Sequence, residues 1–187
     1  MSRKIVIAVT GASGAIYAEK LLSALVTLHG QWEKAAVVFS KNAVDVWEYE
    51  LKKPIPQFNG IVQYNTDDFF APFASGSAGF DTMIICPCSM GTLARIACGY
   101  SDSLITRAAD VMLKERRKLI LAPRETPYSL IHLQNMLTLT QAGAIICPAN
   151  PSFYSMPASV DELCNTVIER ILTLAGFNFE HFSWGNV

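Results

Sequence analysis

Apolar residues form short continuous runs that alternate with helical patterns along the chain. The runs are rich in Val and Ile, which is typical of strands buried on both faces of a parallel sheet. They predict strands at Lys4–Thr10, Ala35–Ser40, Thr82–Cys86, Lys118–Pro123 and Ala144–Cys147. Between them, apolar residues recur three and four positions apart, as on one face of a helix. These stretches predict helices at Ala15–Leu28, Asn42–Leu51, Thr92–Cys98, Leu104–Glu115, Pro127–Gln141 and Ser159–Leu174.

This alternation predicts one doubly wound α/β domain over residues 1–187, of the Rossmann- or flavodoxin-like kind, with a mostly parallel sheet of five or six strands. Two stretches fit neither pattern. Lys52–Gly79 is long for a loop and is expected to be functional or to contact another subunit. The tail 176–187 holds four aromatic residues without a helical period, so we expect it to pack on a neighbouring subunit or over a site.

Composition narrows the class of protein. The 187 residues are 51% hydrophobic and 17% charged, which excludes intrinsic disorder and indicates a large buried core. With 15 basic and 16 acidic residues the net charge is −1, so no global field favours nucleic acid. No run of apolar residues is long enough for a membrane span, and the polar start followed by a short apolar run does not predict a signal peptide.

The five cysteines contain no Cys-x-x-Cys pair. They can be read as a redox or metal site or as small buried hydrophobic residues, and their positions in apolar runs favour the second interpretation. We therefore expect reduced thiols and a cytoplasmic protein.

The first strand leads into a turn of small residues, Gly11–Tyr17, and then into a helix. Such a turn offers backbone N–H groups to a phosphate, although the third glycine of a G-x-G-x-x-G motif is missing. Ligands of open α/β sheets collect at the carboxyl ends of the strands. Those ends carry Ser13, Ser40, the segment Cys88–Thr92, the segment Arg124–Thr126 and the segment Asn150–Tyr154. The sequence therefore predicts a small-molecule site at this edge.

Two charged residues have open interpretations. Arg107 lies in an apolar segment, where either a phosphate ligand or a structural carboxylate would satisfy it. Lys114 follows seven residues later and shares its helix face. Glu125, beside Arg124, is either a carboxylate at the start of the next helix or a general acid with a pKa set by burial.

Five segments together resemble the UbiX family of flavin prenyltransferases, once described as 3-polyprenyl-4-hydroxybenzoate decarboxylases. They are Gly11–Tyr17, Pro87–Met90, Arg107–Val111, Leu113–Arg117 and Arg124–Pro127, and their order and spacing hold over residues 3–175. The resemblance implies transfer of a dimethylallyl group from dimethylallyl monophosphate to reduced FMN. It also implies that the prenylated FMN serves a UbiD-type decarboxylase and that the enzyme is a homo-oligomer, typically a dodecamer.

The resemblance assigns roles residue by residue. It implies FMN binding by Gly11, Ala12, Ser13, Ser40, Ser89, Met90, Gly91, Thr92 and Arg124. It implies binding of dimethylallyl phosphate by Tyr154, Arg170, Arg107 and Lys114, and catalytic roles for Glu125, Glu50 and Ser13. No metal is expected, because cationic side chains can hold a monophosphate directly.

The chain departs from the family pattern at Gly91, where Lys is common, and at Tyr128, where Leu is usual, and Trp184 aligns roughly with a family tryptophan near the prenyl group.

Two other functions are compatible with a flavin-binding fold. Related flavin-dependent cysteine decarboxylases use a His before the third strand and an Asn in a Pro-x-Ser-x-Asn-Thr motif. Here no His lies within Lys52–Gly79, and Gly91 stands in place of that Asn, which disfavours this activity. A flavodoxin-like electron carrier would be acidic with an open flavin edge. This chain is nearly neutral and offers a cationic second site, so the transferase is preferred.

Overall fold

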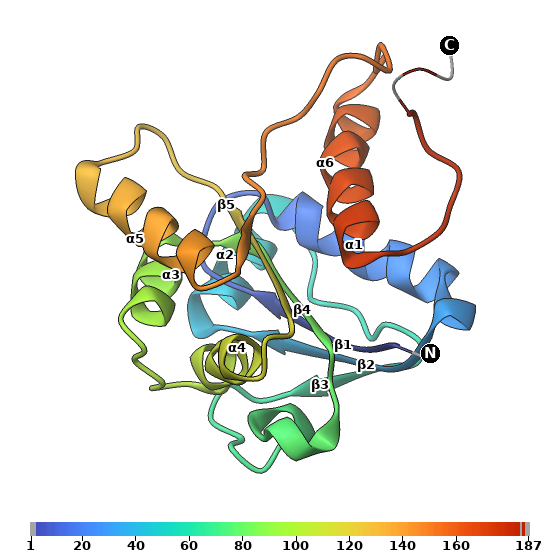
Figure 1. Ribbon diagram of the computed structural model, residues 1–187. Helices are drawn as coiled ribbons and strands as arrows, with labels where there is room; N and C mark the ends of the chain where they lie inside the picture. The colour runs from blue at the N-terminus through green and yellow to red at the C-terminus, as the bar shows by residue number, and fades with distance from the viewer. Residues whose placement is uncertain (1–2, 184, 186–187) are drawn as a thin grey trace.

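The computed structural model describes residues 3–183 and 185, which form a six-stranded parallel sheet covered by helices (Figure 1). The strands are β1 (Arg3–Val9), β2 (Trp32–Phe39), β3 (Ile61–Tyr64), β4 (Thr82–Cys88), β5 (Lys118–Pro123) and β6 (Ile145–Ile146). The helices are α1 (Ala15–Thr27), α2 (Lys41–Leu51), α3 (Met90–Ala97), α4 (Leu104–Lys114), α5 (Leu130–Gln141) and α6 (Val160–Ala175). Three short 3-10 helices are η1 (His29–Gln31), η2 (Pro72–Ala74) and η3 (Gly76–Ala78). The doubly wound α/β fold is confirmed.

The strand order is β3-β2-β1-β4-β5-β6, and every neighbouring pair is parallel. The chain winds outward from β1 in one direction and from β4 in the other. The order therefore reverses between β1 and β4, and a doubly wound sheet binds ligands in the crevice at the carboxyl ends of such a pair.

The central strands bury both faces, as their continuous apolar sequence predicts. On β1, Ile5, Ile7 and Val9 point into one hydrophobic core, while Val6 and Ala8 point into the other, because side chains alternate along a strand. The first core lies under α1, α2 and α6, and the second under α3, α4 and α5. The molecule is thus three layers deep, with α4 and α6 on opposite faces of the sheet (Figure 1).

Most predicted boundaries lie within two residues of those observed, and three elements differ more. The stretch Lys52–Gly79 contains β3, an edge strand that pairs with β2 alone. Its sequence, Ile-Val-Gln-Tyr, is half-exposed, so it does not form the continuous apolar run by which buried strands are predicted. β2 begins at Trp32 rather than Ala35. Its first residues include the exposed Glu33 and Lys34, so this part of the strand does not belong to a continuous apolar run. α5 begins three residues later than predicted, because the hydroxyl of Ser129 accepts a hydrogen bond from the His132 N–H and caps the helix there.

The first part of the tail packs on its own chain. Phe177 is buried in the core under α1 and α6, and the guanidinium of Arg3 lies 4.8 Å from its ring centroid. Gln31 and Asn178 exchange hydrogen bonds of 2.6 and 2.9 Å. Phe177 thus packs on its own chain, whereas packing of the tail on a neighbouring subunit stays a prediction. Phe182 is half-exposed and could meet such a neighbour, and Trp184 lies outside the described residues.

None of the helices within the described ranges is long and apolar enough to cross a bilayer.

Candidate flavin and phosphate site

The start of α1 is capped differently from the other helices. A serine caps each of α2 to α6, its hydroxyl accepting a backbone N–H from the first turn: Ser40, Ser89, Ser103, Ser129 and Ser159. α1 begins after Gly14, which has no capping side chain of its own. The carboxylate of Glu50, near the end of α2, takes this place. It accepts hydrogen bonds from Gly14 N at 2.9 Å and from Ala15 N at 2.7 Å.

This arrangement bears on one expectation from the sequence. The turn Gly11–Gly14 was expected to offer its N–H groups and the positive end of the helix to a phosphate. Two of these donors are already bound by Glu50, whose negative charge also meets the helix dipole. A phosphate on the N–H groups of Gly14 and Ala15 would have to displace a carboxylate.

Glu50 is held as a carboxylate. Partial burial acts to raise its pKa, but hydrogen bonds from the Ser13 hydroxyl and from Ala15 and Gly14, with the charge of Arg124, lower the pKa below its ordinary value. Glu50 is therefore ionised at neutral pH. It can accept a proton from Ser13 or orient its hydroxyl, but it is not a proton donor in its resting state.

Arg124 connects the end of β5 to the turn before α1. It follows β5, and its Nε donates to the backbone oxygen of Ser13 at 3.1 Å. The structure therefore brings together Ser13, Glu50 and Arg124, although they come from β1–α1, α2 and the end of β5. The next residue, Glu125, is half-buried at the same edge, and its carboxylate accepts from Thr126 N at 3.0 Å.

The crevice between β1 and β4 is built around Thr10, a residue outside the set predicted from the sequence. Its buried hydroxyl donates to the Pro87 oxygen at 3.0 Å and accepts from Ser89 N at 2.7 Å. Ser89 in turn donates to the Thr92 hydroxyl at 3.0 Å. The sequence does contain a signal for this role: a threonine ends an apolar strand, and a hydroxyl buried there requires hydrogen-bond partners.

The two glycines of the predicted flavin site have different surroundings. A Cβ on Gly11 would lie 2.4 Å from the Cβ of Asn42, so Gly11 lets the first turn approach α2 closely. A Cβ on Gly91, at the start of α3, would meet nothing within 4 Å. The space beside Gly91 is open at the edge where a flavin is expected. Ala12 and Met90 are buried beside these glycines, and Ser40 caps α2.

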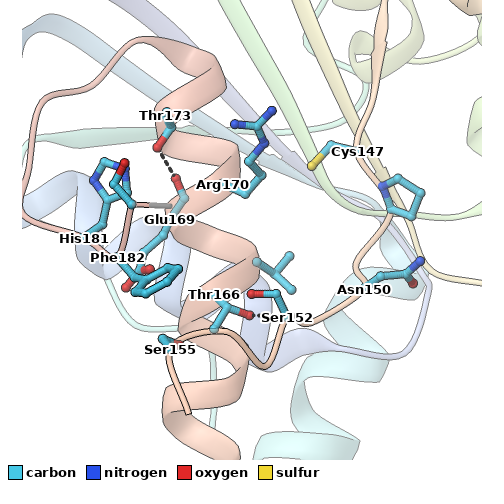
Figure 2. A pocket seen from close by; sticks show the side chains of 13 residues that line it. Cys147, Asn150, Ser152, Ser155, Thr166, Glu169, Arg170, Thr173, His181 and Phe182 are labelled. Carbon is cyan, nitrogen blue, oxygen red and sulfur yellow. Dashed lines mark hydrogen bonds between the residues drawn. The ribbon is translucent and has the colours of Figure 1, made fainter. Parts of the chain in front are cut away.

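A cavity of about 380 Å³ lies between α6 and the segment that follows β6 (Figure 2). Arg170, Glu169 and Thr166 line it from α6, and Cys147 and Asn150 line it from the opposite side. The tail closes a third side with His181, Phe182 and Ser183. Ser152 N donates to the Thr166 hydroxyl at 3.0 Å and fixes the loop to α6.

Charged groups in this cavity influence one another. Burial raises the pKa of the Cys147 thiol, an effect that the positive charge of Arg170 opposes. Burial also raises the pKa of Glu169, against the influence of His181. Arg170 and Tyr154 are exposed, so this side of the edge is open to an anion.

Arg107 and Lys114 are not brought to this cavity in the same chain. Both lie on α4, across the sheet from α6. Arg107 binds Asp110 at 2.9 Å and the Ala74 oxygen at 3.1 Å, and Lys114 binds Glu115 at 2.6 Å. If these two cations meet the same phosphate as Arg170, a second copy of the chain must supply them.

Within residues 3–183 and 185, no group of three or more His, Cys, Asp or Glu side chains could hold a metal ion.

Comparison with known proteins identifies the family. A family model described as Flavoprotein matches residues 1–172. The flavin prenyltransferase UbiX of Methanocaldococcus jannaschii is 44% identical over 188 residues, covering 98% of this chain and all of that protein. Among solved structures, AnUbiX (PadA1) in complex with FMN and dimethylallyl pyrophosphate is 43% identical with a TM-score of 0.91, and 98% of each chain is covered.

Two further solved structures share the fold. A dodecameric FMN-dependent UbiX-like decarboxylase from Escherichia coli O157:H7 is 39% identical with a TM-score of 0.89, covering 98% of this chain and all of that one. The peptidyl-cysteine decarboxylase EpiD is 19% identical with a TM-score of 0.62, covering 93% of this chain and 98% of that one, which shows a shared fold alone. The chain therefore belongs to the UbiX family of flavin prenyltransferases and is an FMN-dependent prenyltransferase.

Proposed function

We propose that the enzyme transfers the dimethylallyl group of dimethylallyl monophosphate to reduced FMN at the carboxyl edge of the sheet. The observation that carries this proposal is the convergence of Ser13, Glu50 and Arg124 at the β1–β4 crevice. A relative at 43% identity binds FMN and dimethylallyl pyrophosphate, which supports the same pair of ligands here. The prenylated FMN would then serve a UbiD-type decarboxylase.

FMN would be held by the residues around this crevice. The open space beside Gly91 can admit a planar ring, and Ser40, Ser89, Thr92 and Arg124 offer hydroxyl and guanidinium groups to a phosphate. Arg124 uses Nε for Ser13, so its Nη groups, which make no hydrogen bond with the described residues, can bind the phosphate. Gly11, Ala12, Ser13 and Met90 would line the rest. When bound and reduced, FMN supplies the nucleophile that receives the prenyl group.

The substrate phosphate would be bound by Tyr154 and Arg170 of one copy and by Arg107 and Lys114 of another. This arrangement is supported by the position of α4 across the sheet from α6. It requires a homo-oligomer, and we propose a dodecamer like that of the 39% identical E. coli protein.

Side chains of this protein can stabilise the phosphate as it leaves the dimethylallyl group. As the C–O bond to phosphate breaks, negative charge grows on the phosphate oxygens, and preorganised arginine and lysine side chains stabilise that charge. Glu125 would share the proton of the bound phosphate monoester and leave that proton on the departing phosphate, and Glu50, being ionised, would orient Ser13. No metal is required for this chemistry, because the cations come from side chains.

A reducing compartment suits the chain, because all five cysteines are free thiols. We therefore propose that the enzyme works in the cytoplasm.

The test is an anaerobic incubation of the enzyme with FMN, dithionite and dimethylallyl monophosphate, followed by mass spectrometry of the released flavin. A flavin heavier by one prenyl group supports the proposal. Parallel reactions without enzyme and with dimethylallyl pyrophosphate serve as controls, because the pyrophosphate is the ligand of the known complex. Flavin of unchanged mass in all reactions would contradict the proposal.

A further inference from the structure

Three charged side chains form a row where α4 ends and the chain turns toward β5. The Lys114 ammonium lies 2.6 Å from Glu115 Oε1, and Arg117 Nη2 lies 3.7 Å from Glu115 Oε2. We call these three residues the α4 row. The hydrogen bond from Lys114, with the charges of Lys114 and Arg117, lowers the pKa of Glu115 below its ordinary value, so Glu115 is a carboxylate at neutral pH. The proposed function gives a role to Lys114 but none to the other two residues.

Arg117 is fixed at one end of the α4 row. Its Nη1 donates to the Phe80 oxygen at 3.0 Å, and its Nη2 donates to the Gly76 oxygen at 2.7 Å. The side chain is only 21% exposed. A planar guanidinium that is bound to two backbone oxygens has little freedom to turn. Its positive charge therefore stays in one place beside Glu115.

Gly76 leaves the space that the Glu115 carboxylate occupies. A Cβ on Gly76 would overlap Glu115 Oε1 and would lie 2.6 Å from the carboxyl carbon of Glu115. The backbone of Gly76 is not in the left-handed region, so other residues can adopt its conformation. The missing side chain at position 76 thus matters for the place of Glu115 and not for the turn itself.

The segment around Gly76 also binds the second cation of α4. Arg107 Nε donates to the Ala74 oxygen at 3.1 Å, and Arg107 Nη1 donates to Asp110 at 2.9 Å. Residues 74–76 therefore contact Arg107 directly and Lys114 through the α4 row. This segment joins η2 to η3 and belongs to the long stretch that the sequence predicts to be functional or to contact another subunit.

The fixed end of the α4 row changes what the Lys114 ion pair can do. Lys114 is 46% exposed, and an isolated ion pair of this kind contributes little. Because Arg117 and Gly76 fix the carboxylate, however, the ammonium has a partner in a defined position. A lysine that is held before a ligand arrives loses less conformational freedom on binding. Its ammonium has three N–H donors, so the bond to Glu115 leaves two for phosphate oxygens.

We propose that Glu115 is a positioning residue, which Arg117 and Gly76 hold in place so that the Lys114 ammonium faces the phosphate of dimethylallyl monophosphate. The inference rests on the proposed function, in which Lys114 of one copy binds this phosphate in the site of another. The alternative is that Glu115 competes with the phosphate for the charge of Lys114. The two effects differ in sign, because loss of a positioning residue weakens phosphate binding, whereas loss of a competitor strengthens it.

Gly76→Ala tests the positioning without removing a charge, because the new Cβ would displace the Glu115 carboxylate. Isothermal titration of the enzyme loaded with oxidised FMN measures binding of dimethylallyl monophosphate without turnover. The dissociation constant should rise about 2–10-fold, the cost of ordering one long side chain, while FMN affinity stays that of the wild type. Gly30→Ala is the matched control, since its Cβ meets nothing within 4 Å, and it should bind like the wild type. Unchanged or tighter binding in Gly76→Ala, or an equal loss in Gly30→Ala, would overturn the proposal.

A double variant separates the positioning of Lys114 from a general disturbance of the loop. In a Lys114→Ala background the ammonium is absent, so Gly76→Ala should cause no further loss of binding. Additive losses would show that Gly76 acts on something else and would overturn the proposal. Glu115→Gln should weaken binding as Gly76→Ala does, and tighter binding would instead identify Glu115 as a competitor.

These measurements are separable from the flavin assay. If prenylated FMN forms while Gly76→Ala binds the monophosphate like the wild type, the transferase proposal stands and this one fails. If the binding pattern is as expected but the flavin mass does not change, the positioning stands and the transfer fails. If Lys114→Ala itself binds like the wild type, Lys114 is wrongly assigned to the phosphate, and the positioning role is overturned with it.

Discussion

The two halves of the candidate site are organised in different ways. On the flavin side, Glu50, Ser13 and Arg124 are joined by hydrogen bonds within one chain. On the phosphate side, Tyr154 and Arg170 are exposed, and the other two predicted cations bind local carboxylates on the far face of the sheet. One half is preorganised by the fold of a single copy. The other half would be completed by the substrate and a second copy.

This difference has an energetic meaning. Side chains already fixed by hydrogen bonds lose little freedom when a ligand arrives, whereas each exposed arginine that is immobilised costs about 0.5–1.5 kcal/mol. We therefore expect substitutions on the flavin side to act through stability and flavin binding. Substitutions on the phosphate side should act on the kinetics of prenyl transfer.

The largest effect is expected from Glu125→Gln. This change removes the proposed proton donor while keeping the size of the side chain, so single-turnover prenyl transfer should slow by ~10²–10⁴-fold. FMN affinity, measured by fluorescence titration, should stay the same. Glu33→Gln, which alters a carboxylate at the start of β2, is the matched control and should leave the rate unchanged. A wild-type rate in Glu125→Gln would show that the donor is wrongly assigned.

The next effect concerns Arg170. Arg170→Ala removes a cation that would bind phosphate equally in the ground and transition states, so KM for dimethylallyl monophosphate should rise with little change in kcat. The rise should be ~10–100-fold, because a hydrogen bond to a charged group contributes about 1.5–3 kcal/mol. Steady-state kinetics at saturating FMN measure both constants. A fall in kcat alone would place Arg170 outside phosphate binding.

The same variant tests whether the site is shared. If Arg107 of one copy and Arg170 of another hold one phosphate, unfolding and refolding a mixture of Arg107→Ala and Arg170→Ala chains should recover activity above that of either variant. Some sites in the mixed oligomers then contain both native arginines. Activity that never exceeds the average of the two variants would contradict the shared site.

Gly11→Ala should have a smaller effect, on stability. The added Cβ would meet the Asn42 Cβ at 2.4 Å and the Asn42 backbone carbon at 3.3 Å, so α2 must shift away from the turn. Such overpacking typically costs ~1–3 kcal/mol, which thermal unfolding would detect as a lower Tm. Gly91→Ala is the matched control, since its Cβ has open space and alanine favours a helix. Equal Tm values for the two variants would contradict the close approach.

The smallest effect is a dependence of stability on pH. The pKa of Glu50 is lowered in the folded protein from an ordinary value of 4.5, so its interactions stabilise the fold fully above that pH. The stabilisation is lost as pH falls below 4.5 and through the folded-state pKa. The difference in free energy of unfolding between wild type and Glu50→Gln should therefore shrink on acidification from pH 6 to pH 3, as measured in urea. A difference that stays constant would contradict the capping role of the charge.

The sequence predicts the parts of the fold that depend on burial. Continuous apolar runs identified five of the six strands, because strands buried on both faces have no polar positions. β3 was missed because an edge strand is half-exposed and short. The start of α5 was misplaced because a local cap at Ser129, not the apolar pattern, decides where the helix begins.

Contacts between distant segments were harder to predict. The motifs placed Ser13, Ser89 and Arg124 at one edge, because the ends of parallel strands meet there. Nothing in the local sequence indicates that Glu50 caps α1, since 36 residues separate the partners and the contact depends on how α2 packs. The separation of Arg107 from Arg170 could not be predicted either. The spacing of apolar residues predicts a helix but not which face of the sheet that helix covers.

Thr10 has a consequence for how the crevice moves. Its hydroxyl is both donor and acceptor between the two central strand ends, and it is 2% exposed. The Ser89 amide lies outside regular secondary structure, yet it should exchange its hydrogen with solvent as slowly as amides in the middle of the sheet. Release of that hydrogen requires the ends of β1 and β4 to separate. We therefore expect hydrogen exchange to report opening of the β1–β4 crevice at the Ser89 amide, and fast exchange there would contradict a closed crevice.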